Sequence, residues 1–250
     1  MRRGLAIAIA AIVVIFCIAV VVVYTSVGSV LVAVVEKYGM EITGSTVTVK
    51  EADFEPSTGT GILVNLSVGN PVGYGKENAF FASDIDIQID PETVSSAVIT
   101  IKRLKIEAPE VIYEITANGD NLRTLRGHIQ NAITQEKSLT RNSTPGERTK
   151  KFIVNDLYIN NGVVIVRTED LDGKRATAII DNIHLEDLGR DEGGISPAEL
   201  VDRIYGPLLR ATSVAALSTD MKLTDQARNI LQGAVDETED VVKQIKKLLK

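Results

Sequence analysis

Two stretches with the same pattern decide the fold, IKRLKI at positions 101–106 and VNDLYI at positions 154–159. Each reads apolar, two polar, apolar, polar, apolar, so the alternation of a half-buried strand is broken once, at the same place. One extra residue in a strand is what a β-bulge requires, and bulges add twist and curl to a sheet. IDNIHL at 180–185 repeats the pattern, and VKEADF at 49–54 fits it more weakly. We therefore predict a curled sheet with an apolar concave face, built by reiteration.

The match between the first two copies continues beyond these stretches without a gap. Pro109 aligns with Gly162, and the apolar positions that follow also align: Val111 with Val164, and Tyr113 with Val166. Because proline and glycine mark turns, each copy is interpreted as a bulged hairpin whose turn lies at this position.

Strict alternation elsewhere predicts further strands. Thr60 to Asn70 and Ile85 to Ile89 alternate apolar and polar residues, and PSTG at 56–59, GNP at 69–71 and GYG at 73–75 supply turn residues. Short connections favour a mostly antiparallel sheet. In total we predict eight strands, near positions 46–50, 60–70, 85–89, 98–106, 110–116, 151–159, 163–167 and 175–185.

Helical periodicity interrupts the strands once and replaces them at the end. Positions 121–133 carry one apolar stripe and predict an inserted helix, whereas 134–150 is polar and is predicted to be a loop. SPAE at 196–199 is a capping box with proline at the first helical position, and a last amphipathic helix is predicted over 224–249. The predicted fold class is thus α+β, with a β-groove domain at 41–187 and a helical region at 195–250.

The last predicted helix has three candidate roles. It can cover a sheet face or an end of the groove, it can pair with a protein partner or a second copy of the chain, or it can lie on a membrane. Its acidic residues precede its lysines, an order that suits the helix dipole. This order does not favour any one of the three roles.

The N-terminus predicts a membrane anchor. Leu5 to Tyr24 contains no charge and no proline, and a helix of this length spans about 30 Å, the thickness of a hydrocarbon core. Arg2 and Arg3 place the N-terminus in the cytoplasm by the positive-inside rule, and the rest of the chain in the periplasm. A cleaved signal peptide is the alternative, but its apolar core is usually shorter. Positions 26–38 are expected to continue as a helical stalk, so that anchor and stalk occupy 1–38.

Composition excludes some function classes. The net charge of −6 and the absence of tryptophan argue against nucleic-acid binding, which needs clustered cations and stacking platforms. Cys17 is the single cysteine and lies within the predicted anchor, so no intramolecular disulfide can form.

No catalytic or metal-binding motif stands out. His128 and His184 have no second histidine or cysteine near them in sequence, so zinc finds no support. Three aspartates around one predicted strand, at 84, 86 and 90, are interpreted as solvent-exposed, and DLDG at 170–173 as a hairpin turn that lacks the remaining ligands of a calcium loop. The expectation is a protein that is not an enzyme and carries no cofactor.

Five segments, in this order along the chain, carry a resemblance to a family of proteins: the anchor, EKYG at 36–39, EITGSTV at 41–47, GILVNLSVGNP at 61–71 and IKRLKIEAPEV at 101–111. The resemblance is to the N-terminal region of AsmA-like proteins of the Gram-negative envelope. The resemblance implies a twisted, taco-shaped sheet with an apolar groove, and the long members of that family are thought to carry phospholipids between membranes. Here the predicted strands end near position 185, and eight strands give a groove of roughly 40 Å, too short to cross a periplasm alone.

Two functions are therefore expected as alternatives. The first is lipid or acyl-chain handling at the bacterial inner membrane, in envelope maintenance or phospholipid transport, with membrane lipid as the partner and its identity open. The second is a non-catalytic scaffold or accessory subunit, whose sheet is filled by its own helices. The candidate groove residues are Val47, Val49, Ile62, Val64, Leu66, Val68, Ile85, Ile87, Ile89, Leu104 and Ile106.

Overall fold

The computed structural model describes residues 27–117, 119–142, 150–168, 175–219 and 223–248. Within these ranges no helix combines the length and apolar character needed to cross a bilayer. The anchor predicted at positions 5–24 lies outside the described residues.

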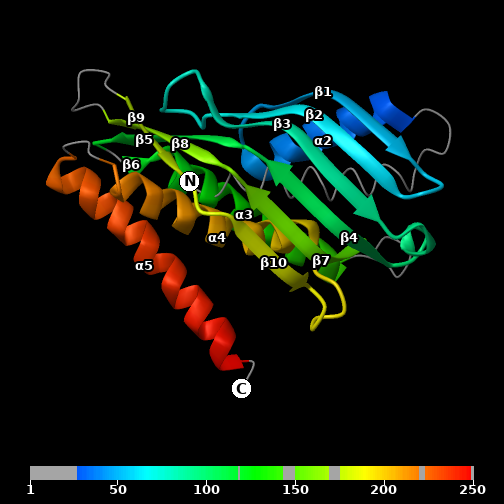
Figure 1. Cartoon of the computed structure of the whole chain (residues 1–250). Helices are drawn as coiled ribbons and strands as arrows, with labels where there is room; N and C mark the ends of the chain where they lie inside the picture. Colours follow the sequence, from blue (N-terminus) through cyan, green and yellow to red (C-terminus); the bar gives the residue numbers. More distant parts are fainter. Residues whose placement is uncertain (1–26, 118, 143–149, 169–174, 220–222, 249–250) are drawn as a thin grey trace.

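The protein is a mixed α+β structure built on one large, open, curled sheet (Figure 1). Across the sheet, β1 is followed by β2 and then β3. Beside β3 lie β4 and β5, beside these lie β7 and β8, and the last positions are taken by β10 next to β7 and β9 next to β8. The short β6 pairs with β5. The bounds are β1 Val47–Glu55, β2 Thr60–Gly69, β3 Asn78–Ile89, β4 Val98–Glu107, β5 Glu110–Thr116, β6 Gly119–Asp120, β7 Lys151–Asn160, β8 Val163–Thr168, β9 Arg175–Ile179 and β10 Ile183–Leu188.

Several strands are halves of longer ones, and this overturns the predicted hairpins. β4 and β5 do not pair with each other; both pair with β3, β4 with its second half and β5 with its first. β7 and β8 lie end to end in the same way beside β4 and β5. Pro109 and Gly162 therefore mark bends in continuous strands, beside Ala108 at φ 47° and Asn161 at φ 55°.

The repeat detected in the sequence becomes a parallel strand pair. β7 lies parallel to β4, with Leu104 beside Leu157, and β8 lies parallel to β5, with Val111 beside Val164. The expectation of a mostly antiparallel sheet holds for the other strand pairs. Parallel pairing needs a long crossover between the two strands, and the helix that follows β6 lies in it.

One line of outward-facing residues crosses the whole sheet. In each long strand, two consecutive side chains point away from the core at this line. The alternation of buried and outward residues therefore shifts by one residue there. The strand registers place these residue pairs side by side, and Asn65, Ala108 and Asn161 on the line have positive φ. From β1 to β10 the pairs are 50–51, 64–65, 83–84, 107–108, 160–161 and 181–182.

A second, shorter line crosses β4, β7 and β10. Its outward pairs are 102–103, 155–156 and 186–187, and the register between β3 and β4 shifts beside it, between Gln88 and Ile89. The predicted bulge is therefore present in β4. IKRLKI and VNDLYI break their alternation on this second line, whereas VKEADF and IDNIHL break it on the first, so the four stretches are not copies of one unit. Interruptions aligned across neighbouring strands bend them together, and this accounts for the curl.

The helix α2, Val27–Thr43, packs against β1. Leu31 and Val35 are buried in the core, and the carboxylate of Glu36 accepts a hydrogen bond of 3.0 Å from the backbone N–H of Val49. The residues expected to form a stalk are thus part of the body. Gly39 does not end this helix, which continues to Thr43 and is followed by Gly44 at φ 59°.

α3 and α4 lie against one face of the sheet, and α5 lies outside α4 (Figure 1). α3, Asn121–Asn142, runs nine residues past the predicted end, so much of the expected polar loop is helical; positions 143–149 lie outside the described residues. α4, Pro197–Leu217, begins with the predicted capping box on Ser196 and Glu199. α5, Asp225–Leu248, matches its predicted span and packs on α4. Side chains from all four helices and from the sheet form one continuous core.

Candidate functional site

The candidate groove residues lie on the concave face, with two exceptions. Nine of the eleven are buried in the same core, each at most 5% exposed: Val47, Val49, Leu66, Val68, Ile85, Ile87, Ile89, Leu104 and Ile106. The sequence alternation thus identified most of the apolar face correctly.

Ile62 and Val64 were placed on the wrong face. Both are half-buried on the convex side, and Leu63 takes the buried position between them. The reason is Asn65, whose positive φ of 52° changes the phase of the alternation within β2. The alternating apolar residues of β2 therefore face the convex side before Asn65 and the core after it.

The closest helix–strand approaches lie at the two sides of the sheet. α2 contacts β1 on one side, whereas α3, α4 and α5 contact β5 and the strands from β7 to β10 on the other. The apolar face of β2, β3 and β4 lies between these two groups, with Leu63, Leu66, Ile87 and Leu104 along it.

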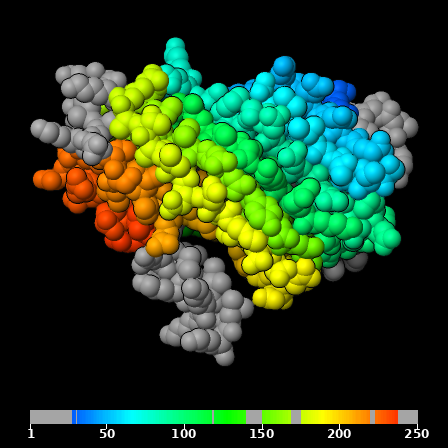
Figure 2. Space-filling model, viewed as in Figure 1, coloured from blue at the N-terminus to red at the C-terminus, as the bar shows by residue number. Residues whose placement is uncertain are grey.

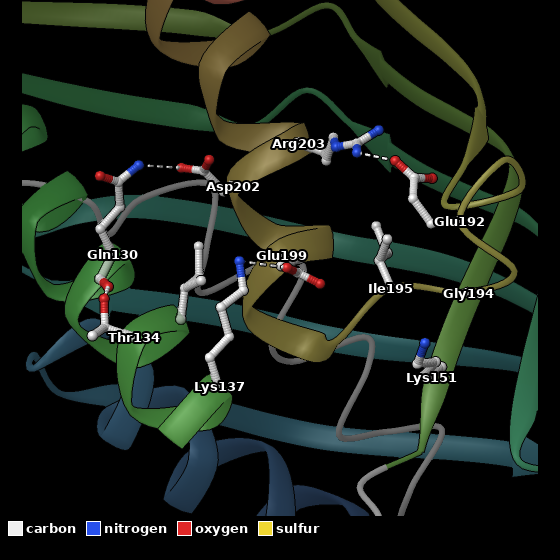
Figure 3. Close-up of a pocket in the computed structure, with 11 residues that line it drawn as sticks. Gln130, Thr134, Lys137, Lys151, Glu192, Gly194, Ile195, Glu199, Asp202 and Arg203 are labelled. Carbon is white, nitrogen blue, oxygen red and sulfur yellow. Dashed lines mark hydrogen bonds and ion pairs between the residues drawn. The ribbon is translucent and has the colours of Figure 1, made fainter. Parts of the chain in front are cut away.

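A polar pocket of about 560 Å³ opens beside this core, between α3, the start of α4 and β7 (Figure 3). Two ion pairs border it: Lys137 contacts Glu199 at 2.9 Å, and Arg203 contacts Glu192. Gln130 also donates to Asp202 across it, at 3.4 Å. With charges of both signs on its wall, this pocket suits a small polar or zwitterionic molecule and not an acyl chain.

Two glutamates beside the first turn of α4, Glu136 of α3 and Glu199 of α4, differ in their proton affinity. Burial raises the pKa of Glu136, whose carboxylate accepts a hydrogen bond of 3.4 Å from the N–H of Ala198. Burial also acts to raise the pKa of Glu199, but hydrogen bonds from Lys137 and from the N–H of Ser196 outweigh it and bring that pKa below its usual value. The difference follows from the partner cation that Glu199 has.

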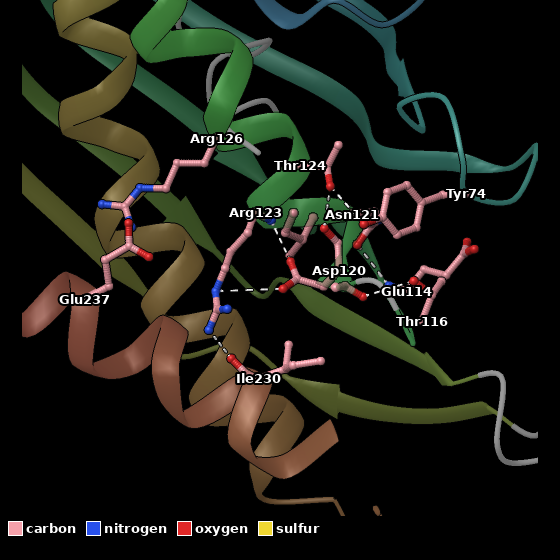
Figure 4. Close-up of polar contacts among 12 residues, drawn as sticks. Tyr74, Glu114, Thr116, Asp120, Asn121, Arg123, Thr124, Arg126, Ile230 and Glu237 are labelled. Carbon is pink, nitrogen blue, oxygen red and sulfur yellow. Dashed lines mark hydrogen bonds and ion pairs between the residues drawn. The ribbon is translucent and has the colours of Figure 1, made fainter. Parts of the chain in front are cut away.

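A polar cluster joins the loop after β2 to α3 (Figure 4). The side chain of Asn121 donates to Asn70 and to the backbone carbonyl of Ile112, both at 2.7 Å. Glu114 accepts from Asn70 at 3.3 Å and from the N–H of Gly75 at 2.8 Å. Asn70, which belongs to the motif GILVNLSVGNP, therefore holds the loop against α3 and β5.

The same cluster attaches α5. Arg123 pairs with the buried Asp120 at 3.7 Å and also donates to the backbone carbonyl of Ile230 in α5. Arg126 forms an ion pair of 2.7 Å with Glu237 one turn further along (Figure 4). These contacts serve the assembly of the fold.

The remaining residues considered for chemistry fall in different places. Asp84 and Asp86 are exposed as expected, and Asp90 caps a short 3-10 helix at Pro91–Thr93 and pairs with Lys102 at 3.4 Å. The ring of His128 contacts the backbone carbonyl of Thr43. The turn expected at 170–173 lies outside the described residues.

Sequence reasoning missed one cluster, formed by Asp156, His184 and Glu186 on the convex face. The signal was present: His184 and Glu186 are two residues apart in a strand and so share a face. Only the pairing of β10 with β7 brings Asp156 beside them, and sequence spacing does not contain that pairing.

Comparison of the sequence with protein-family models and with curated proteins yields no match.

Proposed function

We propose that the protein is an envelope module that handles lipid acyl chains on the concave face of its sheet. The observation that carries this proposal is the run of aliphatic side chains along β2, β3 and β4, which forms one continuous apolar face in the core. Aliphatic side chains along neighbouring strands of a curled sheet offer an extended apolar track. The resemblance to AsmA-like proteins and the predicted anchor support a position of this track at the periplasmic side of an inner membrane.

Lipid entry on this proposal requires a change of conformation. Ile85 and Leu104 are fully buried, so an acyl chain reaches them only when the segments that cover β2 to β4 move away. The exchange is favourable in energy only if the lipid restores the apolar burial that the opening removes, about 25 cal/mol per Å².

The burial of the same residues favours a second candidate, a non-catalytic scaffold or accessory subunit. An apolar face that is already buried needs no ligand, because the exposed patch that would demand one is covered. On this alternative the sheet and its helices serve as one rigid body for assembly with other envelope proteins.

Site-specific photo-crosslinking in living cells separates the two. Crosslinkers at Ile87 and Leu104 on the concave face are expected to capture phospholipid. Val64 on the convex face of the same sheet is the matched control and is expected to capture none. Crosslinks from Ile87 and Leu104 exclusively to the chain's own helices would reject lipid handling and favour the scaffold.

A further inference from the structure

We infer that Asp156 of β7 and His184 and Glu186 of β10 form a zinc-binding site on the convex face of the sheet. One ligand atom from each of the three residues lies within 4.8 Å of the other two. This inference concerns the opposite face from the proposed acyl-chain track and does not depend on it.

Strand pairing brings the three side chains together. Glu186 lies directly opposite Asp156 in the antiparallel pair of β10 and β7, and His184 follows the same face of β10. Asp156 and Glu186 belong to the second line of outward residues, where two consecutive side chains of each strand point away from the core. β7 and β10 lie on the face seen in Figure 2, where they form part of the accessible surface.

The charges of the cluster favour a bound cation. Two carboxylates directly opposite each other across a strand pair repel and destabilise the sheet. Arg103 of β4 lies beside Asp156 on its other side and supplies one positive charge. A divalent cation between Asp156 and Glu186 would remove the remaining repulsion.

The histidine is held in a suitable orientation. Its Nε2 atom and Oδ1 of Asp156 lie 2.8 Å apart and form a hydrogen bond, so the two ligand atoms already face each other, and a zinc ion bound to both would replace the proton between them. The ring of Tyr158 stacks on the imidazole with 4.3 Å between centroids and 11° between planes. Stacking restricts rotation of the ring and so reduces the loss of side-chain entropy when a metal binds.

One imidazole nitrogen and two carboxylates are zinc ligands, with bonds of about 2.0–2.2 Å. His184 and Glu186 are exposed and Asp156 is half-buried, so their side chains have room to rotate toward a shared ion. Calcium and magnesium prefer sites made of oxygen alone, so the imidazole favours a transition metal. Three protein ligands leave the fourth tetrahedral position to water or to an outside ligand.

The test is zinc binding to the full chain in detergent micelles, without a histidine tag, measured by isothermal titration and native mass spectrometry. One zinc ion per chain is expected. His184→Gln and Glu186→Gln should each weaken binding by at least about 100-fold, because loss of an outer-shell partner alone typically costs 10–100-fold. Asp86→Asn removes an exposed carboxylate from the same face, outside the cluster, and should leave the affinity unchanged.

Two further measurements make the assignment specific. Arg103→Gln should tighten zinc binding, because it removes a cation beside Asp156. In NMR spectra the ring signals of His184 should shift on addition of zinc while those of His128 stay in place. The absence of binding by the unmodified chain, or equal affinity in the double variant His184→Gln/Glu186→Gln, would overturn the site.

Discussion

Leu104 of β4 and Leu157 of β7 lie side by side in a parallel strand pair, and both side chains are fully buried. They occupy equivalent places in the two sequence stretches with the same pattern. Positions that are equivalent in the two sequence stretches are therefore also direct neighbours in the strand pair of β4 and β7. The next residue toward the N-terminus of each, Arg103 or Asp156, faces outward on the second line of outward residues.

Alanine at the leucine of either stretch should destabilise the fold strongly. Leu157→Ala and Leu104→Ala are each expected to cost about 2–5 kcal/mol of unfolding free energy, because they leave cavities in the core. Asp156→Ala should cost less than about 1 kcal/mol, since its side chain is on the surface. Urea melts of a fragment without the predicted anchor, residues 27–250, measure both. A neutral Leu157→Ala together with an unfolded Asp156→Ala would contradict the assignment of faces.

The helix α2 should be required for the stability of the sheet. A fragment that begins at Glu41 removes most of α2, exposing the side of β1 that it covers and deleting the buried Leu31 and Val35. We expect its urea midpoint to lie well below that of the fragment from residue 27. Equal midpoints would mean that α2 is a free stalk after all.

Asn65 should tolerate glycine but not a β-branched residue. Its φ of 52° is accessible to glycine without steric cost, whereas valine there should cost about 1–3 kcal/mol. Thermal melts of Asn65→Gly and Asn65→Val compare the two, and Ser67→Val in the same strand controls for the change of side chain. If Asn65→Val were as stable as Asn65→Gly, β2 would not change phase at this position.

Glu136 should make stability fall as the pH rises. Burial raises its pKa in the folded protein above the ordinary value of 4.5, so the folded state binds the proton more tightly than the unfolded state. Stability is thus fully present below 4.5 and declines as the pH rises through the folded-state pKa. Relative to the unmodified chain, Glu136→Gln should gain stability as the pH rises above 4.5 and through the folded-state pKa of Glu136.

Glu199→Gln provides the contrast, because the pKa of Glu199 is lowered in the folded protein. The contribution of this carboxylate is present above its unfolded-state pKa and is lost as the pH falls through the folded-state value. Glu199→Gln should therefore lose stability near neutral pH relative to the unmodified chain. Parallel pH profiles for the two variants would show that the two glutamates do not differ.

The pair of Arg126 and Glu237 should hold α5 on the body. The Arg126 side chain is only 6% exposed, and Glu237→Gln would leave its charge close to the core without a counter-charge. Hydrogen–deuterium exchange in α5 should become faster in this variant, while Asp236→Asn, an adjacent exposed carboxylate, should leave it unchanged. Unaltered exchange in Glu237→Gln would show that apolar packing alone holds the helix.

The predicted topology places the C-terminus outside the cytoplasm. A periplasm-dependent reporter fused after Lys250 should be active, because the positive-inside rule predicts that Arg2 and Arg3 keep the N-terminus in the cytoplasm. Activity of a cytoplasm-dependent reporter at the same position would reverse the orientation. A mature chain beginning near Ser29 would indicate a cleaved signal peptide.

The local sequence pattern correctly predicted those features of the fold that depend on residues close together in the chain. Alternation located most strands, and the capping box located the start of α4 at its residue, because both signals are contained within a few positions. The same local reasoning interpreted Pro109 as a hairpin turn. Proline favours a turn in isolation, but only β3, which pairs with both β4 and β5, shows that the chain continues in the same direction.

The sequence also predicted the residues of the candidate site only where local alternation determines which face they occupy. Ile87 was assigned to the apolar face because regular alternation surrounds it, and Leu104 because the break before it was interpreted as a bulge. Ile62 and Val64 were misassigned because a single residue with positive φ interrupts the alternation. The cluster of Asp156 with His184 depends on pairing between distant strands. Cross-strand register is set by the packing of the whole core, so it could not be derived from the spacing of these residues.

The parallel alignment of β4 with β7 also constrains the order in which the chain can fold. β1, β2 and β3 connect through short turns, so they can pair as soon as they are made. β7 reaches β4 only after β5, β6 and the whole of α3 lie between them in the chain. Closing this long loop costs entropy before any contact repays it, so we expect the β1–β3 meander to form early and the β4–β7 pair to set the slow step of folding.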